Sequence, residues 1–261
     1  MAREQARAWR PEVPGVTEVL HAHFTEHAYP AHVHGTWTLL LVDTGGVDYA
    51  LDGRPHRAAP GSVTVLPPDV PHDGRAIHVD GFDKRVLYLE QTWLDAGLVG
   101  PAVSAPLVGA DLARSVSRLH DALELGDSLE AESRLALVSE EIGGRLDLWR
   151  PPVSRRQGRG VAREVRDRLD ACGAEAPTLV EMAAQLGVDP THVVRAFRRE
   201  YGIPPHQYLT GRRVDRARRL LLAGEAAADV AVEVGFHDQS HLIRHFRRVL
   251  GVTPRAYLRS A

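Results

Sequence analysis

Two segments of this 261-residue sequence carry arginines and small polar residues on one side of a predicted helix. Val193 and Phe197 in one, and Leu242 and Phe246 in the other, predict the buried side of a helix. The residues between these anchors face outwards: Thr191, His192, Val194, Arg195, Arg198 and Arg199, then Gln239, Ser240, His241, Arg244, Arg247 and Arg248. Arginine suits guanine and phosphate, and glutamine suits adenine, so these residues are candidate DNA contacts.

The position of each arginine on its helix predicts its partner. Arg195 and Arg244 lie on the N-terminal side of their helices, where base edges are contacted. Later positions are typical of phosphate contacts, which orient the protein without reading sequence. We therefore expect Arg198, Arg199, Arg247 and Arg248 to bind phosphates.

The two segments belong to an internal repeat. Apolar residues at 179, 182, 183 and 186 precede Gly187, and the same spacing recurs 48 residues later before Gly235. Each copy predicts a helix, a short turn with glycine and a second helix, over about 178–199 and 226–249. A longer helix over 206–223 would hold the copies at a fixed separation.

This repeat resembles the AraC/XylS family of bacterial transcription regulators. The strings EMAAQLGVDPTHVVRAFRREYGIPPHQYL at 181–209 and VGFHDQSHLIRHFRRVLGVTPRAYL at 234–258 carry the resemblance. It implies an all-α domain with two helix-turn-helix motifs, joined to a variable domain that senses a signal or dimerises. Two positions depart from the family: Val194 replaces a polar residue, and Leu242 replaces an aromatic one.

The N-terminal part is rich in short segments of Val, Leu, Thr and aromatics, which is typical of antiparallel strands. His32 and His34 before TWTLLLVD, with His72 after PGSVTVLPPDVP, resemble the two motifs of cupin barrels. Three neutral imidazoles suit Zn, Fe, Ni or Cu. Thr38 stands where metal-binding cupins place a carboxylate, so two alternatives remain: a three-histidine metal site, or histidines that only form hydrogen bonds.

The barrel is expected to enclose a small-molecule cavity, because a barrel of this size holds one small ligand. Strand alternation and proximity to the histidine motifs indicate the lining residues: His32, His34, Trp37, Leu39, Tyr49, His72 and Tyr88. An error of one residue in register would invert this set.

We predict a two-domain α+β protein. A cupin-like antiparallel β-barrel sensor over 1–100 is followed by a helical pair over 101–149, a linker over 150–160 and the DNA-binding domain over 161–261. The helical pair has apolar stripes formed by Leu112, Val116, Leu119, Leu135, Val138 and Ile142. They indicate either a dimer interface or an ordinary hairpin packed on the barrel.

The charge distribution supports this division. Residues 1–152 have 13 basic and 22 acidic side chains, whereas residues 153–261 have 19 and 12, so a net charge of −2 hides a basic C-terminal half. One cysteine excludes a disulfide framework within the chain and a multi-thiolate zinc site. No apolar run could span a bilayer and no signal peptide is evident, so we expect a cytoplasmic protein without membrane contact.

These features favour a non-enzymatic transcription regulator that binds double-stranded promoter DNA and has no obligatory cofactor. The expected partners are a small-molecule effector, a second copy of the chain in a homodimer, and RNA polymerase. Two alternatives are a ligand-independent dimerising regulator with a structural barrel, and a metal-dependent cupin enzyme fused to a DNA-binding domain.

Overall fold

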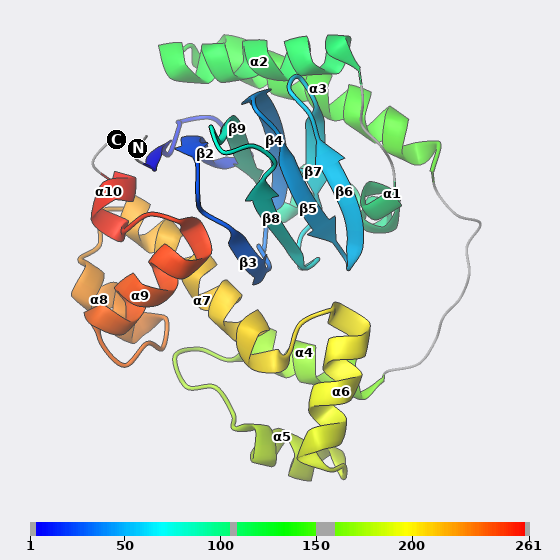
Figure 1. The fold of residues 1–261 in the computed structure, drawn as a ribbon, viewed down its shortest axis with the longest axis vertical. Coiled ribbons are helices and arrows are strands. Elements are labelled where there is room, and N and C mark those ends of the chain that lie inside the picture. Colours follow the sequence, from blue (N-terminus) through cyan, green and yellow to red (C-terminus); the bar gives the residue numbers. More distant parts are fainter. Residues whose placement is uncertain (1–3, 105–108, 150–159, 259–261) are drawn as a thin grey trace.

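The computed structural model describes residues 4–104, 109–149 and 160–258 (Figure 1). The predicted linker, except for Gly160, lies outside the described residues. The β-rich N-terminal domain and the helical C-terminal domain confirm the predicted two-domain α+β class. No helix in the described part of the chain is both long and apolar enough to cross a bilayer.

Two antiparallel sheets, which together are called the barrel below, form the N-terminal domain. The five-stranded sheet has the order β1-β2-β9-β4-β7, and the four-stranded sheet has the order β3-β8-β5-β6. The strands are β1 (Gln5–Trp9), β2 (Val16–Phe24), β3 (Tyr29–His32), β4 (Trp37–Thr44), β5 (Val47–Leu51), β6 (Arg54–Ala58), β7 (Val63–Leu66), β8 (His72–Ala76) and β9 (Phe82–Leu89).

The five-stranded sheet is buried on both faces. On β4, Trp37, Leu39 and Leu41 point to one apolar cluster, whereas Val42 belongs to a second cluster on the opposite face. Both faces of such a strand are apolar, so the sequence shows little alternation of apolar and polar residues.

The first of these clusters lies under a helical hairpin. Short helices η1 (Gln91–Trp93), η2 (Ala96–Leu98) and α1 (Val99–Ser104) lead to α2 (Ala110–Leu125) and α3 (Ser128–Asp147), which cover the sheet (Figure 1). The predicted stripes are buried against the chain's own sheet: Leu112, Val116, Leu119, Leu135, Val138 and Ile142. Of the two alternatives, a dimer interface or a hairpin packed on the barrel, the structure shows the hairpin.

The C-terminal domain contains both predicted helix-turn-helix motifs. Helices α5 (Leu179–Leu186) and α6 (Pro190–Tyr201) form the first, and α8 (Ala227–Glu233) and α9 (Gln239–Leu250) form the second. Helix α7 (Pro205–Leu222) joins them, while α4 (Val161–Ala171) and α10 (Pro254–Leu258) lie at the two ends of the domain.

Local sequence explains where these helices begin. The Asp189 and Asp238 carboxylates accept hydrogen bonds from the Thr191 and His241 amides, both at 2.7 Å, at the starts of α6 and α9. At the start of α5, Thr178 forms a capping box with Glu181.

The two domains touch along α7 and at the end of α9, where glycines permit close approach. A Cβ atom at Gly211 of α7 would lie 3.2 Å from the Val33 amide nitrogen. At Gly251, φ is +80°, and a Cβ atom would lie 2.7 Å from both Phe24 and His27. A side chain at Gly211 would require Val33 to shift by a few tenths of an ångström, and one at Gly251 would require Phe24 and His27 to move.

Candidate ligand cavity and nucleic-acid interface

A cavity of about 60 Å³ lies between the two sheets. Its wall is mainly apolar and aromatic, with a few polar groups, as in small-molecule sites. The sheets contribute most of the lining, and the C-terminal domain contributes Leu250 and Tyr257. A molecule in this cavity would therefore contact both domains.

The structure places five of the predicted lining residues at this cavity: His32, His34, Tyr49, His72 and Tyr88. The prediction for Trp37 and Leu39 is wrong, because both side chains point to the opposite face and join the core beneath α2 and α3. Trp37 contacts Trp93 edge to face there, and its indole N–H donates to the Gln91 carbonyl at 3.2 Å. Their neighbours Thr38 and Leu40 line the cavity instead.

The three predicted histidines lie close together in the wall of the cavity. The ring centroids are 4.8 Å apart for His32 and His34, 4.5 Å for His32 and His72, and 4.9 Å for His34 and His72. Burial lowers the pKa of all three imidazoles, and the pKa of His72 falls to about 3. The rings are therefore neutral near pH 7, the form in which imidazole can act as an acceptor or a metal ligand.

Lys84 on β9 is a cavity residue that the sequence analysis missed. Its ammonium lies 4.2 Å from the Tyr29 ring centroid and 5.3 Å from that of Phe24. No carboxylate pairs with it among residues 4–104, 109–149 and 160–258. Burial, together with repulsion from Arg218, lowers the pKa of Lys84 to about 7. One sequence signal was available: Lys84 is the only lysine of the chain.

A buried cluster of charges joins the cavity wall to α7. The Arg218 Nε atom lies 2.9 Å from the Glu18 carboxylate of β2, and its Nη2 atom lies 3.0 Å from Asp215. All three side chains are at most 3% exposed. The Arg218 guanidinium also stacks on Tyr88, and the Tyr257 hydroxyl donates to Glu18.

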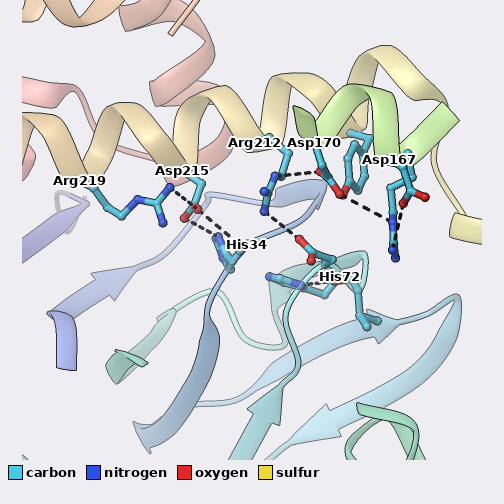
Figure 2. Close-up of polar contacts among 12 residues, drawn as sticks. His34, His72, Asp167, Asp170, Arg212, Asp215 and Arg219 are labelled. Atoms are coloured by element: carbon cyan, nitrogen blue, oxygen red, sulfur yellow. Dashed lines mark hydrogen bonds and ion pairs between the residues drawn. The ribbon is translucent and has the colours of Figure 1, made fainter. Parts of the chain in front are cut away.

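Asp215 connects this cluster of charges to the histidines of the cavity wall. Its carboxylate lies 3.6 Å from Nδ1 of His34 and accepts a hydrogen bond from the Gly35 amide at 3.3 Å (Figure 2). Burial alone would raise the pKa of Asp215, but Arg218, His34 and Arg219 outweigh it and lower the pKa below its usual range. Asp215 therefore stays ionised.

A second set of ion pairs lies further along α7. The Arg212 guanidinium binds Asp69 of the barrel at 2.8 Å and Asp170 of α4 at 3.3 Å (Figure 2). The Tyr208 hydroxyl donates to the same Asp170 carboxylate at 2.8 Å. Both sets of ion pairs hold helix α7 to the barrel, and neither was predicted from the sequence.

The candidate DNA contacts lie on the outer faces of α6 and α9. The anchors Val193, Phe197, Leu242 and Phe246 are all fully buried. Most of the predicted contacts are exposed: Thr191, His192, Arg195, Arg198, Arg199, Gln239, Ser240, Arg244, Arg247 and Arg248. Val194 and His241 are half-buried.

The six arginines of this set have no carboxylate partner in the part of the chain that the structure describes. They contrast with Arg212 and Arg218 of α7, whose charges are paired. Unpaired guanidinium groups on two helices are available for phosphates and base edges.

Comparison with known proteins agrees with both parts of this description. Residues 14–138 match the family described as the AraC-like ligand binding domain, and residues 182–260 match a helix-turn-helix domain family. An uncharacterized HTH-type transcriptional regulator, YbfI of Bacillus subtilis, is 36% identical over 67 residues, which cover 26% of this chain and 24% of that protein.

Solved structures of ToxT from Vibrio cholerae share the whole fold. An apo variant of ToxT aligns over 97% of this chain and 96% of its own with a TM-score of 0.62 and 8% identity. Wild-type ToxT bound to an unsaturated fatty acid aligns over 97% and 92% with a TM-score of 0.54 and 9% identity. Such low identities show the fold alone. With a ligand-binding domain and a helix-turn-helix domain both matched, the chain belongs to the AraC family of transcriptional regulators and is not an enzyme.

Proposed function

We propose that this regulator binds specific promoter DNA through α6 and α9, and that a small molecule in the barrel cavity controls this binding. The observation that carries the proposal is the composition of the cavity wall, to which Leu250 and Tyr257 of the DNA-binding domain contribute. A ligand shifts an equilibrium only if it binds one arrangement more tightly than another. A ligand that touches both domains meets this condition.

The effector we infer is small and acidic. The cavity volume of about 60 Å³ is well below the roughly 150 Å³ that accommodates benzene in an engineered protein core. Lys84 has no carboxylate partner in the described residues and a pKa lowered to about 7, so a bound anion would stabilise its ammonium form. ToxT has been crystallised with a fatty acid, which is also acidic, but a long-chain acid exceeds the volume of this cavity.

Helix α7 is the proposed route from cavity to DNA. It carries Asp215 and Arg218, which contact His34 and Tyr88 in the cavity wall, and it joins the two helix-turn-helix motifs. A ligand that moves either ring would move the contacts that hold α7 to the barrel. The separation or orientation of α6 and α9 would then change.

We further propose that the protein acts in the cytoplasm as a homodimer and contacts RNA polymerase at its promoters. The apolar stripes of α2 and α3 are buried against the sheet, so they are not available for a dimer interface. Exposed apolar residues elsewhere on α2 and α3, among them Leu125, Leu129 and Leu137, offer another surface.

A thermal-shift screen of the full-length protein tests the ligand proposal. Small carboxylic acids should raise the melting temperature, whereas their uncharged amides should not, and Lys84→Met should remove the effect. An acid identified in this way should also change the affinity for operator DNA. If no acid shifts the melting temperature, the barrel is structural and the regulator is ligand-independent.

A further inference from the structure

The three histidines in the cavity wall have the arrangement of a metal site. Within the described residues, His32, His34 and His72 are the one group of three or more His, Cys, Asp or Glu side chains whose donor atoms converge. These donor atoms lie within 4.8 Å of one another. Three nitrogens about 2.1 Å from one tetrahedral ion are roughly 3.4 Å apart, so side-chain shifts of about an ångström would close the site.

Backbone carbonyls set the tautomers of two of the rings. Nδ1 of His32 lies 2.8 Å from the Pro30 carbonyl oxygen, and Nδ1 of His72 lies 3.1 Å from that of Val70. A carbonyl oxygen only accepts, so each Nδ1 carries the proton and donates. The lone pair of each neutral ring is then on Nε2, which is free to bind a metal ion.

Asp215 occupies the corresponding place behind the third ring. Its carboxylate lies 3.6 Å from Nδ1 of His34, at a slightly greater distance than a direct hydrogen bond. A carboxylate or carbonyl behind Nδ1 is the usual support of a metal-binding histidine. Asp215 differs from the other two supports in one respect: it belongs to α7 of the DNA-binding domain.

The site has room for a fourth ligand. Thr38 stands where a carboxylate ligand would otherwise lie, and it lines the cavity. Its hydroxyl is buried without a hydrogen-bond partner in the described structure. Three protein ligands and one open position are typical of metal sites that exchange water for another ligand. The Thr38 hydroxyl offers a partner for a metal-bound water or anion.

The charge of Arg218 near the site is compensated, whereas that of Lys84 is not. Arg218 is paired with both Glu18 and Asp215, so its charge is compensated. Lys84 lines the same cavity and has no such pair in the described chain. An anion in the fourth position would offset the charges of both the ion and Lys84.

We propose that His32, His34 and His72 bind one divalent transition-metal ion through Nε2, and that Asp215 of the DNA-binding domain positions His34 for this role. The ligand set suits Zn²⁺, Co²⁺, Ni²⁺ or Fe²⁺. The metal site does not depend on effector control. Only an effect of the metal on DNA affinity rests on the proposed function.

Titration of the untagged full-length protein with Co²⁺ tests the site directly. We expect one Co²⁺ per chain, with the strong visible absorption of a four-coordinate ion, and competition by Zn²⁺. His72→Gln should weaken binding by about 100-fold or more, with folding checked by circular dichroism. A pale six-coordinate spectrum, or equal binding by His72→Gln, overturns the proposal. The spectrum of the wild-type protein decides the question if the variant does not fold.

His245→Gln is the matched control. The His241 and His245 rings on α9 have centroids 4.7 Å apart, so they are the obvious competing place for a loosely held ion. This variant should bind Co²⁺ as the wild type does. Loss of the four-coordinate spectrum in His245→Gln would place the metal on α9 and contradict the proposed site.

Asp215→Asn tests the positioning role. One Co²⁺ should still bind, but about 10- to 100-fold more weakly and with a changed absorption spectrum, because Nδ1 of His34 loses its charged partner. An unchanged affinity and spectrum would exclude this role. Operator affinity with and without Zn²⁺ is a separate measurement. Metal binding with no change in DNA affinity would leave the site standing and count against control through the cavity.

Discussion

The guanidinium carbon of Arg218 lies 3.5 Å from the centroid of the Tyr88 ring. Tyr88 lines the cavity, whereas Arg218 belongs to the helix that joins the two helix-turn-helix motifs. The same guanidinium is paired with Glu18 and Asp215 in a region closed to solvent. A signal in the barrel and the geometry of the DNA-binding helices therefore depend on one set of side chains.

Arg218→Met should destabilise the protein strongly. The substitution leaves the ionised Asp215 buried without its cation and removes the guanidinium partner of Glu18. Removing one partner of a buried ion pair costs about 3–5 kcal/mol. Chemical denaturation would measure the loss. Arg216→Met on the same helix is the control, because Arg216 is exposed and its one ion pair within the described residues is with Glu233 at 2.7 Å, a contact that contributes about 0–1 kcal/mol. Equal losses in the two variants would show that the buried cluster does not hold the domains together.

Lys84 should titrate near pH 7. Incorporation of ¹³C-labelled lysine gives a single side-chain resonance, because the sequence has no other lysine. Its chemical shift should report a pKa of about 7, since burial and Arg218 both disfavour the ammonium. A saturating acidic effector should raise this value. A pKa near 10.5 in the free protein would show that the ammonium is well solvated.

Lys84 should contribute stability that increases above pH 7, and Glu18, whose folded pKa is about 8, opposes this increase only up to about pH 8. The folded pKa of Lys84 is depressed to about 7, so between pH 7 and about 10.5 the unfolded chain binds more protons than the folded chain. The free energy of unfolding then rises by up to about 1.4 kcal/mol per pH unit from this group. Lys84→Met should lose this contribution. Parallel pH profiles for the two proteins would contradict the assignment.

Acid should destabilise the barrel through its histidines. The pKa of His72 is about 3 in the folded protein, so as the pH falls from 6.5 towards 3 the unfolded chain gains a proton that the folded chain does not. His32 and His34 act in the same direction, and Lys84 and Arg218 nearby reinforce it. Glu18 has the opposite effect on stability, because burial raises its pKa to about 8. It is one group, whereas three histidines destabilise the folded protein in acid.

Melting temperatures of the wild type and His72→Gln between pH 4 and pH 7 would check this prediction. The wild type should lose about 1.4 kcal/mol per pH unit below 6.5 from His72 alone, so the variant should have the shallower profile. A steeper profile in the variant would be the opposite of the expected result.

Local patterns explain why the helix-turn-helix units could be predicted from sequence. The anchors Val193 and Phe197 lie one helical turn apart, and the caps Asp189 and Asp238 are adjacent in sequence to the helices that they begin. Both signals require only a few neighbouring residues. The predicted helices over 178–199 and 226–249 accordingly match α5, α6, α8 and α9.

The cavity was harder to predict because it depends on which face of each strand points inwards. Segment TWTLLLVD is apolar on both faces, since α2 and α3 cover the outer one, so alternation could not separate Trp37 from Thr38. The contact between His34 and Asp215 joins residues 181 positions apart. It exists only because the two domains dock, and no local pattern contains that information.

Affinity for selected and scrambled DNA tests the central claim most directly. After binding-site selection with the full-length protein, the selected duplex should bind at least about 10³-fold more tightly than a scrambled one, with affinity falling steeply as salt increases. Arg244→Ala should weaken the selected duplex by about 10- to 100-fold and the scrambled duplex far less, whereas Arg114→Ala on α2 should change neither. Equal affinity for both duplexes, or equal losses on both in Arg244→Ala, would contradict a sequence-specific regulator.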